Sequence, residues 1–172
     1  MTRTYVGYVL LWCALGCGGA ETRPDLHQQA PDFRALDQAG QPRTLTEFRG
    51  KAVVLYFYPR DGTPGCTTEA CAFRDSWDRI EALNGQVVGV STDNVASHRQ
   101  FAEEHDLDFP LLADPEGEIL AAYGVGQMLG MARRITFIID EDGVVRRVFE
   151  DVDPGVHVDE VAAVLEELQR SR

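Results

Sequence analysis

The chain has few of the features that bring proteins to nucleic acids or to acidic membranes. It contains one lysine, Lys51, has no run of basic residues, and carries a formal net charge of −12 over 172 residues. Duplex nucleic acid and anionic lipid headgroups both require clustered Lys and Arg side chains. Neither is therefore expected as a partner, and we interpret the acidity as that of a solvated surface.

The N-terminal segment lacks an apolar run long enough to cross a bilayer comfortably. Its run extends from Tyr5 to Leu15, follows the positive charge of Arg3, and is followed by small residues. This length suits the hydrophobic part of a secretory leader. The end of the run, "ALGC", resembles a bacterial lipoprotein cleavage box that lipidates its cysteine, Cys17, although Ala14 stands where such boxes usually carry leucine.

Residues 1–17 are thus predicted to be a signal or lipoprotein leader. We expect an exported, periplasmic protein that touches the membrane only through a lipid on Cys17. Two alternatives stay open: a cleaved leader without lipid, and a cytoplasmic protein whose leader is not processed or whose start codon is misassigned.

Cysteine is scarce in the body of the chain. Of four cysteines, Cys13 would leave with the leader and Cys17 would become the anchor, so that only Cys66 and Cys71 remain. A secreted fold stapled by disulfides would carry more cysteines, spread along the chain. A bridge across so short a loop would also constrain the unfolded chain little. The pair is therefore not expected to be a structural staple.

One domain is expected over residues 31–172, after a polar, non-periodic tether over residues 18–30. Hydrophobic patterning predicts a hairpin near residues 31–45 and then alternating strands and helices. The expected strands are 52–58, 86–92, 109–114, 134–140 and 144–150, and the expected helices are 64–83, 95–105, 118–123 and a closing one. This order indicates an α/β fold with a mixed sheet and helices on both faces, the thioredoxin-like arrangement.

Cys66 stands where a nucleophile is expected. Thr63 is a favourable N-cap and Pro64 a favourable first residue for the helix that follows strand 52–58. The N–H groups of a first helical turn have no helical acceptor, and the positive end of the dipole lies there, which favours a thiolate. This is also the sheet edge at which α/β folds bind ligands.

Cys71 lies off the face that Cys66 begins. That face continues through Ala70, Phe73, Trp77 and Ile80 at helical spacing. Five residues of helix correspond to about 7.5 Å of rise and roughly 140° of rotation. A disulfide needs Cα atoms within about 7 Å and facing Cβ vectors. The two thiols can therefore join only if the first turns of the helix unwind.

Metal binding by the cysteine pair would need further thiolate or imidazole ligands. The histidines of the body are scattered, and we interpret His98, His105 and His157 as structural or solvated. Metal delivery stays a third, weaker alternative to nucleophilic chemistry.

The letters "PRDGTPGC" match the P-x-x-x-T-x-x-C signature of peroxiredoxins through Pro59, Thr63 and Cys66. The second cysteine in "CTTEAC" makes the chain resemble the Q-type branch, also called bacterioferritin comigratory protein. Segments 89–93, 109–125 and 134–140 are similar to family segments as well, so the resemblance covers nearly the whole body and excludes the leader. Only the linker 124–133 looks shorter than in that branch.

The resemblance implies a role for each matching position. Cys66 would be the peroxidatic cysteine that becomes a sulfenic acid, and Cys71 the resolving cysteine that condenses with it. Thr63 would hold the peroxide by a hydrogen bond, and Pro59 would shield the site from water. Arg134 would stabilise the thiolate and the developing negative charge, as in the "R-x-x-F" strand of the family.

Arg133 competes with Arg134 for this last role. Alternation along a strand points only one of the two side chains towards the site, and the sequence does not fix which one.

The resemblance implies a thiol-dependent peroxidase that reduces hydrogen peroxide and organic hydroperoxides without metal, haem or flavin. It would be recycled by thioredoxin or a similar dithiol protein and would act as a monomer or weak dimer. The same motif could also serve a thiol–disulfide exchange or redox-sensing module, which is the alternative from a different functional class.

Overall fold

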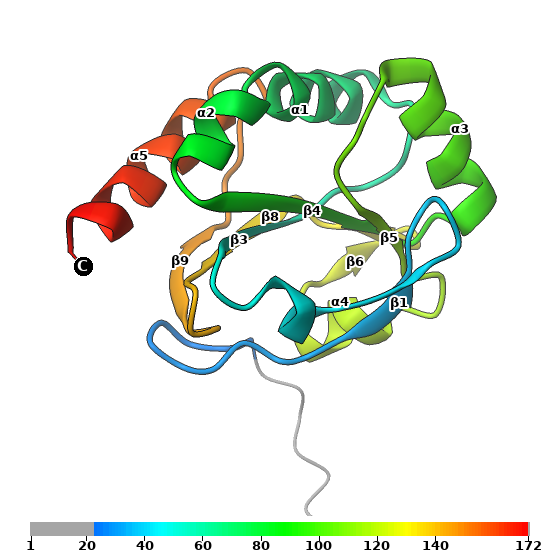
Figure 1. Ribbon diagram of the computed structural model, residues 1–172. Coiled ribbons are helices and arrows are strands. Elements are labelled where there is room, and N and C mark those ends of the chain that lie inside the picture. Colours follow the sequence, from blue (N-terminus) through cyan, green and yellow to red (C-terminus); the bar gives the residue numbers. More distant parts are fainter. Residues whose placement is uncertain (1–22, 172) are drawn as a thin grey trace, which may run out of the picture.

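The apolar run expected at residues 52–58 forms β3 (Ala52–Phe57), in which every residue is buried. A strand buried on both sides needs neighbours and covering layers. β3 pairs in parallel with β4 (Gly85–Ser91) and antiparallel with β8 (Ile135–Ile139). The computed structural model describes residues 23–171, and Figure 1 shows this sheet between two layers of helices.

The mixed sheet has seven strands in the order β2-β1-β5-β4-β3-β8-β9. Its remaining strands are β1 (Arg34–Leu36), β2 (Pro42–Thr44), β5 (Leu111–Ala113) and β9 (Val145–Phe149), and a separate hairpin pairs β6 (Gln127–Met128) with β7 (Met131–Ala132). The thioredoxin-like α/β fold with a mixed sheet is confirmed.

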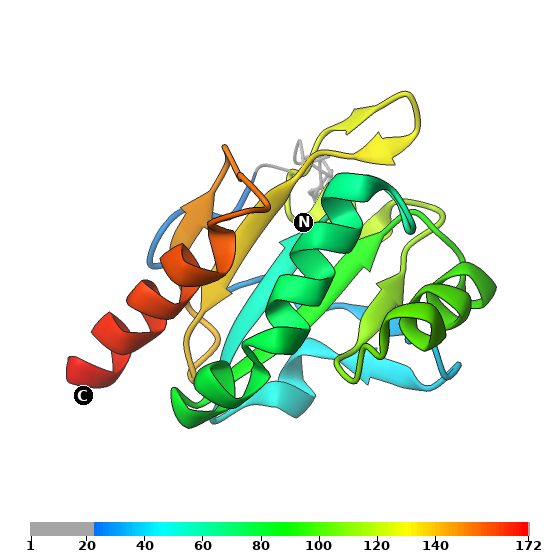
Figure 2. The ribbon, with the colours of Figure 1, turned by 90° about the horizontal axis from the view of Figure 1, so that it is seen from above.

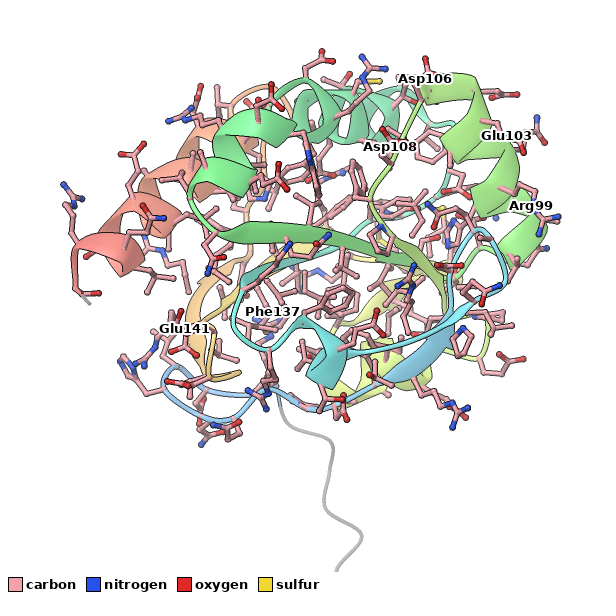
Figure 3. All side chains as sticks on the ribbon, viewed as in Figure 1. Arg99, Glu103, Asp106, Asp108, Phe137 and Glu141 are labelled. Atoms are coloured by element: carbon pink, nitrogen blue, oxygen red, sulfur yellow. The ribbon has the colours of Figure 1, made fainter. Side chains whose placement is uncertain are left out.

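Helices cover both faces of the sheet (Figure 1). One face carries α1 (Pro64–Asp75), α2 (Trp77–Ala82), α3 (Val95–His105) and α5 (His157–Arg170), and the other carries the short helices η1 (Leu45–Phe48) and α4 (Glu118–Ala122). Successive side chains of β3 point to opposite faces of the sheet and so enter two hydrophobic cores. Val54 and Tyr56 pack with α1 and α5, whereas Leu55 packs on the opposite face. Figure 3 shows Phe137 of β8 on that opposite face.

The helix expected over residues 64–83 is interrupted. Ser76, with φ −102° and ψ 11°, separates α1 from α2. Serine competes for backbone hydrogen bonds and is a weak residue for a helix interior. The buried face nevertheless continues across the break, because Ile80 is fully buried and Trp77 packs on the same core.

The tether expected over residues 18–30 is wrong in its second half. The His27 N–H donates to the Val145 carbonyl at 2.8 Å, and the Val145 N–H donates to the Gln28 carbonyl at 2.9 Å. Arg23 pairs with Glu150 at 2.7 Å. These bonds are made mainly by backbone groups, so the pattern of apolar residues in the sequence does not predict them. The leader, Cys17 and the first part of the tether lie outside the described residues.

None of the helices within residues 23–171 combines the length and the hydrophobicity that a bilayer crossing requires.

Seen from above, α1 lies over the central strands and begins at the end of the sheet past which the hairpin β6–β7 projects (Figure 2). This hairpin occupies the linker 124–133. The fold thus brings the start of α1, the end of β3 and the start of β8 to one place.

Candidate active site

Cys66 lies in the first turn of α1 and is 2% exposed. Thr63 is the N-cap residue, with extended φ and ψ of −76° and 146°. Its side chain, however, does not cap the helix as a favourable N-cap residue would. The Thr63 hydroxyl instead donates to the carbonyl of Arg60 at 3.2 Å. The free N–H groups of the first turn therefore remain available near the Cys66 thiol.

Arg134 is the arginine that reaches this thiol. Its Nη2 donates to Cys66 Sγ at 3.2 Å. The register of β8 explains the choice: Thr136 stands opposite Tyr56, so positions 134, 136 and 138 face α1. Arg133 is exposed and lines a cavity at the surface. Of the two arginines that the sequence could not separate, Arg134 is the one whose side chain faces the thiol.

Glu69 is a member of the site that the sequence analysis missed. Its side chain is fully buried, and Arg134 Nη1 donates to its Oε2. One guanidinium therefore binds the thiol and the carboxylate together. Glu69 stands three residues after Cys66 and beside Ala70 of the buried helix face. The sequence did hold one sign of this role, a carboxylate next to the buried face of the helix. A buried carboxylate rarely lacks a partner, so its position pointed to a nearby cation.

Burial controls the charges of this group. It raises the pKa of Glu69 to about 7, although the charge and hydrogen bond of Arg134 act in the opposite direction. Burial alone would lower the pKa of Arg134, but the negative charges of Glu69 and Cys66 raise it, so the guanidinium stays charged. Glu69 Oε1 has no hydrogen-bond partner among the described residues, in keeping with a carboxyl that readily takes a proton.

The raised pKa of Glu69 predicts a pH-dependent stability. The folded protein holds this proton more tightly than the unfolded chain. The contribution of Glu69 to the free energy of unfolding is therefore largest at low pH and is lost as pH rises from about 4.5 to about 7. Relative to Glu69→Gln, the wild type should lose about 2 kcal/mol of unfolding free energy between pH 5 and pH 8. Urea denaturation at both pH values measures this difference.

The exposed variant Glu103→Gln, on α3, is the matched control and should follow the wild type at both pH values. Parallel stability curves for Glu69→Gln and the wild type would show that Glu69 does not titrate in this range.

Pro59 and Arg134 line one side of a cavity of about 300 Å³. The hairpin β6–β7 forms another side through Met128 and Met131. Pro59 is half-buried at the end of β3, next to the Cys66 helix. A peroxide entering from solvent would find this cavity beside the guanidinium that holds the thiol.

Cys71 is half-buried on α1, and both Cys66 and Cys71 are free thiols. The helix between them is continuous. The two thiols therefore lie on different faces of one intact helix, as their spacing predicts. Within residues 23–171, no group of three or more His, Cys, Asp or Glu side chains is arranged to hold a metal ion.

A thioredoxin-like sheet that presents a buried thiol, held by an arginine at the start of a helix, fits a thiol-based peroxidase. The model of the AhpC/TSA family matches residues 26–148. The chain belongs to this family and, within it, to the peroxiredoxins of the Q and BCP type. It is a thiol-dependent peroxidase that acts on hydroperoxides.

Three relatives illustrate the match. The chloroplastic peroxiredoxin Q of Sedum lineare is 42% identical over 142 residues, which cover 81% of this chain and 76% of that protein. The crystal structure of the peroxidoxin BcpB of Mycobacterium tuberculosis has a TM-score of 0.79 and 38% identity, covering 84% and 98% of the two chains. A bacterioferritin comigratory protein of Xanthomonas campestris, studied for its alkyl peroxide reduction activity, has a TM-score of 0.74 and 31% identity, covering 78% and 90%.

Proposed function

We propose that Cys66 is the peroxidatic cysteine of this peroxidase. The observation that carries the proposal is the 3.2 Å contact between Arg134 Nη2 and Cys66 Sγ in a buried first helical turn. The thiolate sulfur attacks one peroxide oxygen, and the O–O bond breaks. The other oxygen leaves with a proton as water or an alcohol, and Cys66 becomes a sulfenic acid.

The neighbouring residues are assigned to the same step. Arg134 stabilises the thiolate and the charge that develops on the peroxide, since a fixed cation is effective in a site closed to water. Thr63 presents its hydroxyl to the peroxide, and Pro59 shields the site. The Xanthomonas relative supports organic hydroperoxides as substrates beside hydrogen peroxide.

Cys71 is proposed to resolve the sulfenic acid. Its sulfur attacks the Cys66 sulfur, water leaves, and an intrachain disulfide forms. Because α1 is continuous between them, the first turns of the helix unwind for this step. An external dithiol of the thioredoxin type then reduces the disulfide and restores both thiols.

Mass spectrometry tests this cycle directly. Trypsin should release residues 61–74, which lie between Arg60 and Arg74 and contain both cysteines. After one equivalent of hydrogen peroxide, this peptide should lose the mass of two hydrogens without binding a sulfenic-acid reagent such as dimedone. Cys71→Ser is the control and should instead bind dimedone at Cys66. A stable sulfenic acid in the wild type would remove the resolving role from Cys71.

We also propose that residues 1–17 direct export, with Cys17 as a lipid-bearing residue. The support is the sequence alone: a positive start, an apolar run and the "ALGC" box. A periplasmic copy would need an extracytoplasmic dithiol donor. Cell fractionation of the full chain should find it outside the cytoplasm and, for the wild type but not for Cys17→Ser, in the membrane fraction. Recovery of the full-length chain in the cytoplasm would contradict the proposal.

A further inference from the structure

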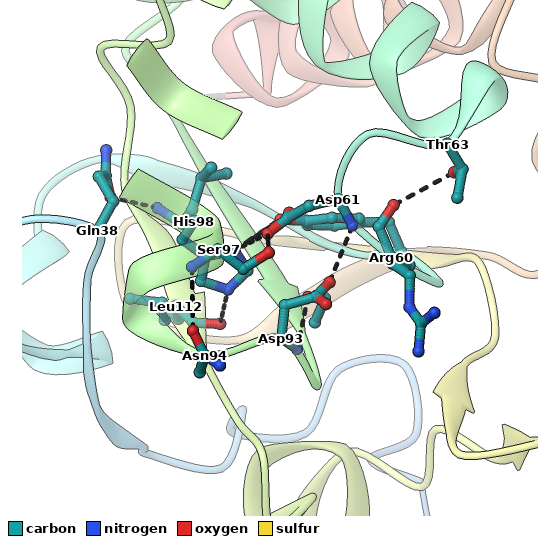
Figure 4. Close-up of polar contacts among 12 residues, drawn as sticks. Gln38, Arg60, Asp61, Thr63, Asp93, Asn94, Ser97, His98 and Leu112 are labelled. Carbon is teal, nitrogen blue, oxygen red and sulfur yellow. Dashed lines mark hydrogen bonds and ion pairs between the residues drawn. The ribbon is translucent and has the colours of Figure 1, made fainter. Parts of the chain in front are cut away.

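The loop between β3 and α1 is held by a cluster of polar side chains centred on Asp61 (Figure 4). The Asp61 carboxylate accepts the hydroxyls of Tyr58 and Ser97, each at 2.7 Å, and lies 2.9 Å from Nδ1 of His98. The Asp61 side chain is only 7% exposed, and His98 is fully buried. The loop that carries Pro59 and Thr63 is thus tied to α3 from within the protein.

His98 is held through both of its ring nitrogens. Nδ1 faces the Asp61 carboxylate, and Nε2 faces the carbonyl of Leu112 in β5 at 3.1 Å. Both of these partners are acceptors, so the ring is held at both of its nitrogens. Burial alone would raise the pKa of Asp61, but the hydrogen bond and charge of His98 lower it below its ordinary value. The two side chains form a buried ion pair.

A second contact acts on the backbone of the same residue. The Asp61 N–H donates to Oδ2 of Asp93 at 2.9 Å, and that oxygen also accepts the Ser91 hydroxyl at 2.8 Å. The Asp61 N–H and the Arg60 carbonyl belong to one planar peptide unit, so they point in opposite directions. The Arg60 carbonyl is the group that accepts the Thr63 hydroxyl. Figure 4 shows both bonds on either side of this unit.

The consequence is a chain of contacts from the protein interior to the hydroxyl of Thr63, the residue that precedes the Cys66 helix. Fixing Asp61 by its side chain and its N–H fixes the direction of the Arg60 carbonyl, and this carbonyl sets the position of the Thr63 hydroxyl. Buried ion pairs contribute little to net stability, and their best-attested use is to select one arrangement among several. We propose that Asp61 and His98 are positioning residues for peroxide reduction, acting through the Arg60–Asp61 peptide unit on Thr63. This inference rests on the proposed roles of Cys66 and Thr63.

Two reagents with different requirements test the link. Hydrogen peroxide must be held and aligned before it reacts with Cys66, whereas iodoacetamide needs only an accessible thiolate. In Asp61→Asn and His98→Gln, the rate constant of Cys66 oxidation should fall about 10–100-fold, the cost of a small misplacement in an active site. Alkylation of Cys66 by iodoacetamide should stay within about threefold of the wild type, because the thiol, Arg134 and Glu69 are untouched.

Three further variants make the result decisive. Leu120→Ala, buried in the core on the other face of the sheet, controls for loss of stability and should leave the ratio of the two rate constants unchanged. Ser97→Ala removes one bond to Asp61 but keeps the ion pair, and should lower the same ratio by a smaller factor. Thr63→Val reports on the proposed function itself and should slow oxidation without slowing alkylation.

The results distinguish a failure of the proposed role of Thr63 from a failure of the positioning role of Asp61 and His98. If Thr63→Val oxidises at the wild-type rate, the proposed role of Thr63 is wrong and this inference is overturned with it. If Thr63→Val is slow while Asp61→Asn and His98→Gln are not, only the positioning role is overturned. An equal change in oxidation and alkylation in these two variants also overturns it, since that would report a general opening of the site.

Discussion

Replacing Cys66 by serine should abolish peroxide consumption. A serine hydroxyl in the same place is not ionised near neutral pH and cannot accept an oxygen atom as a thiolate does. The loss should exceed about 10⁴-fold, the scale seen when a covalent nucleophile is removed. A steady-state assay with hydrogen peroxide and a thioredoxin-type reductant measures it.

The fold should survive this change. Serine is smaller than cysteine, and its hydroxyl can still accept the hydrogen bond from Arg134, so the urea midpoint should move little. Cys71→Ser is the matched control: its first oxidation by peroxide should keep the wild-type rate while its product changes. Peroxide turnover retained by Cys66→Ser would move the nucleophile to another residue and remove the proposed mechanism.

Replacing Arg134 by glutamine should slow the oxidation of Cys66 by about 10²–10³-fold. Removing one fixed donor from a developing negative charge has this cost in other active sites. The variant also loses the only hydrogen bond that the described residues make to the Cys66 sulfur. Stopped-flow oxidation of the reduced protein by hydrogen peroxide gives the rate constant.

Glu69 requires a second variant in this experiment. Without Arg134, the buried Glu69 carboxylate loses its partner and will take a proton. The double variant Arg134→Gln with Glu69→Gln therefore removes the charged pair together and isolates the effect on Cys66. Arg133→Gln, at the exposed neighbouring position, should change the rate less than twofold. If Arg133→Gln were the slow variant, the assignment of the site arginine would be reversed.

Much of the architecture follows from local patterns. The apolar run of β3 and the amphipathic helix α3, expected at residues 95–105 and found there, are set by residues close in the sequence. The break at Ser76 and the docking of residues 23–30 were not predictable in the same way. Both depend on how the backbone meets other parts of the fold, and neither carries an apolar period that would mark it.

The same distinction between local patterns and long-range contacts holds for the site. Pro59, Thr63 and Cys66 lie within one short motif, so the sequence places them together. Arg134 could not be separated from Arg133, since the choice depends on the pairing of β8 with β3. The scattered His98 was interpreted as structural or solvated; its acidic partner, Asp61, lies 37 residues away, so nothing in the sequence marked the buried ion pair.

The docked segment before residue 31 bears on how the protein should be handled in solution. β9 is the last strand of the sheet order, and residues 27–28 satisfy the outward N–H and carbonyl of its Val145. Unpaired strand edges invite pairing with other chains and aggregation. At the opposite end, β2 begins with Pro42, which has no N–H to offer. A shortened protein that starts at residue 31 would therefore leave the start of β9 unpaired and open to association with other chains, whereas one that starts at residue 23 keeps it paired.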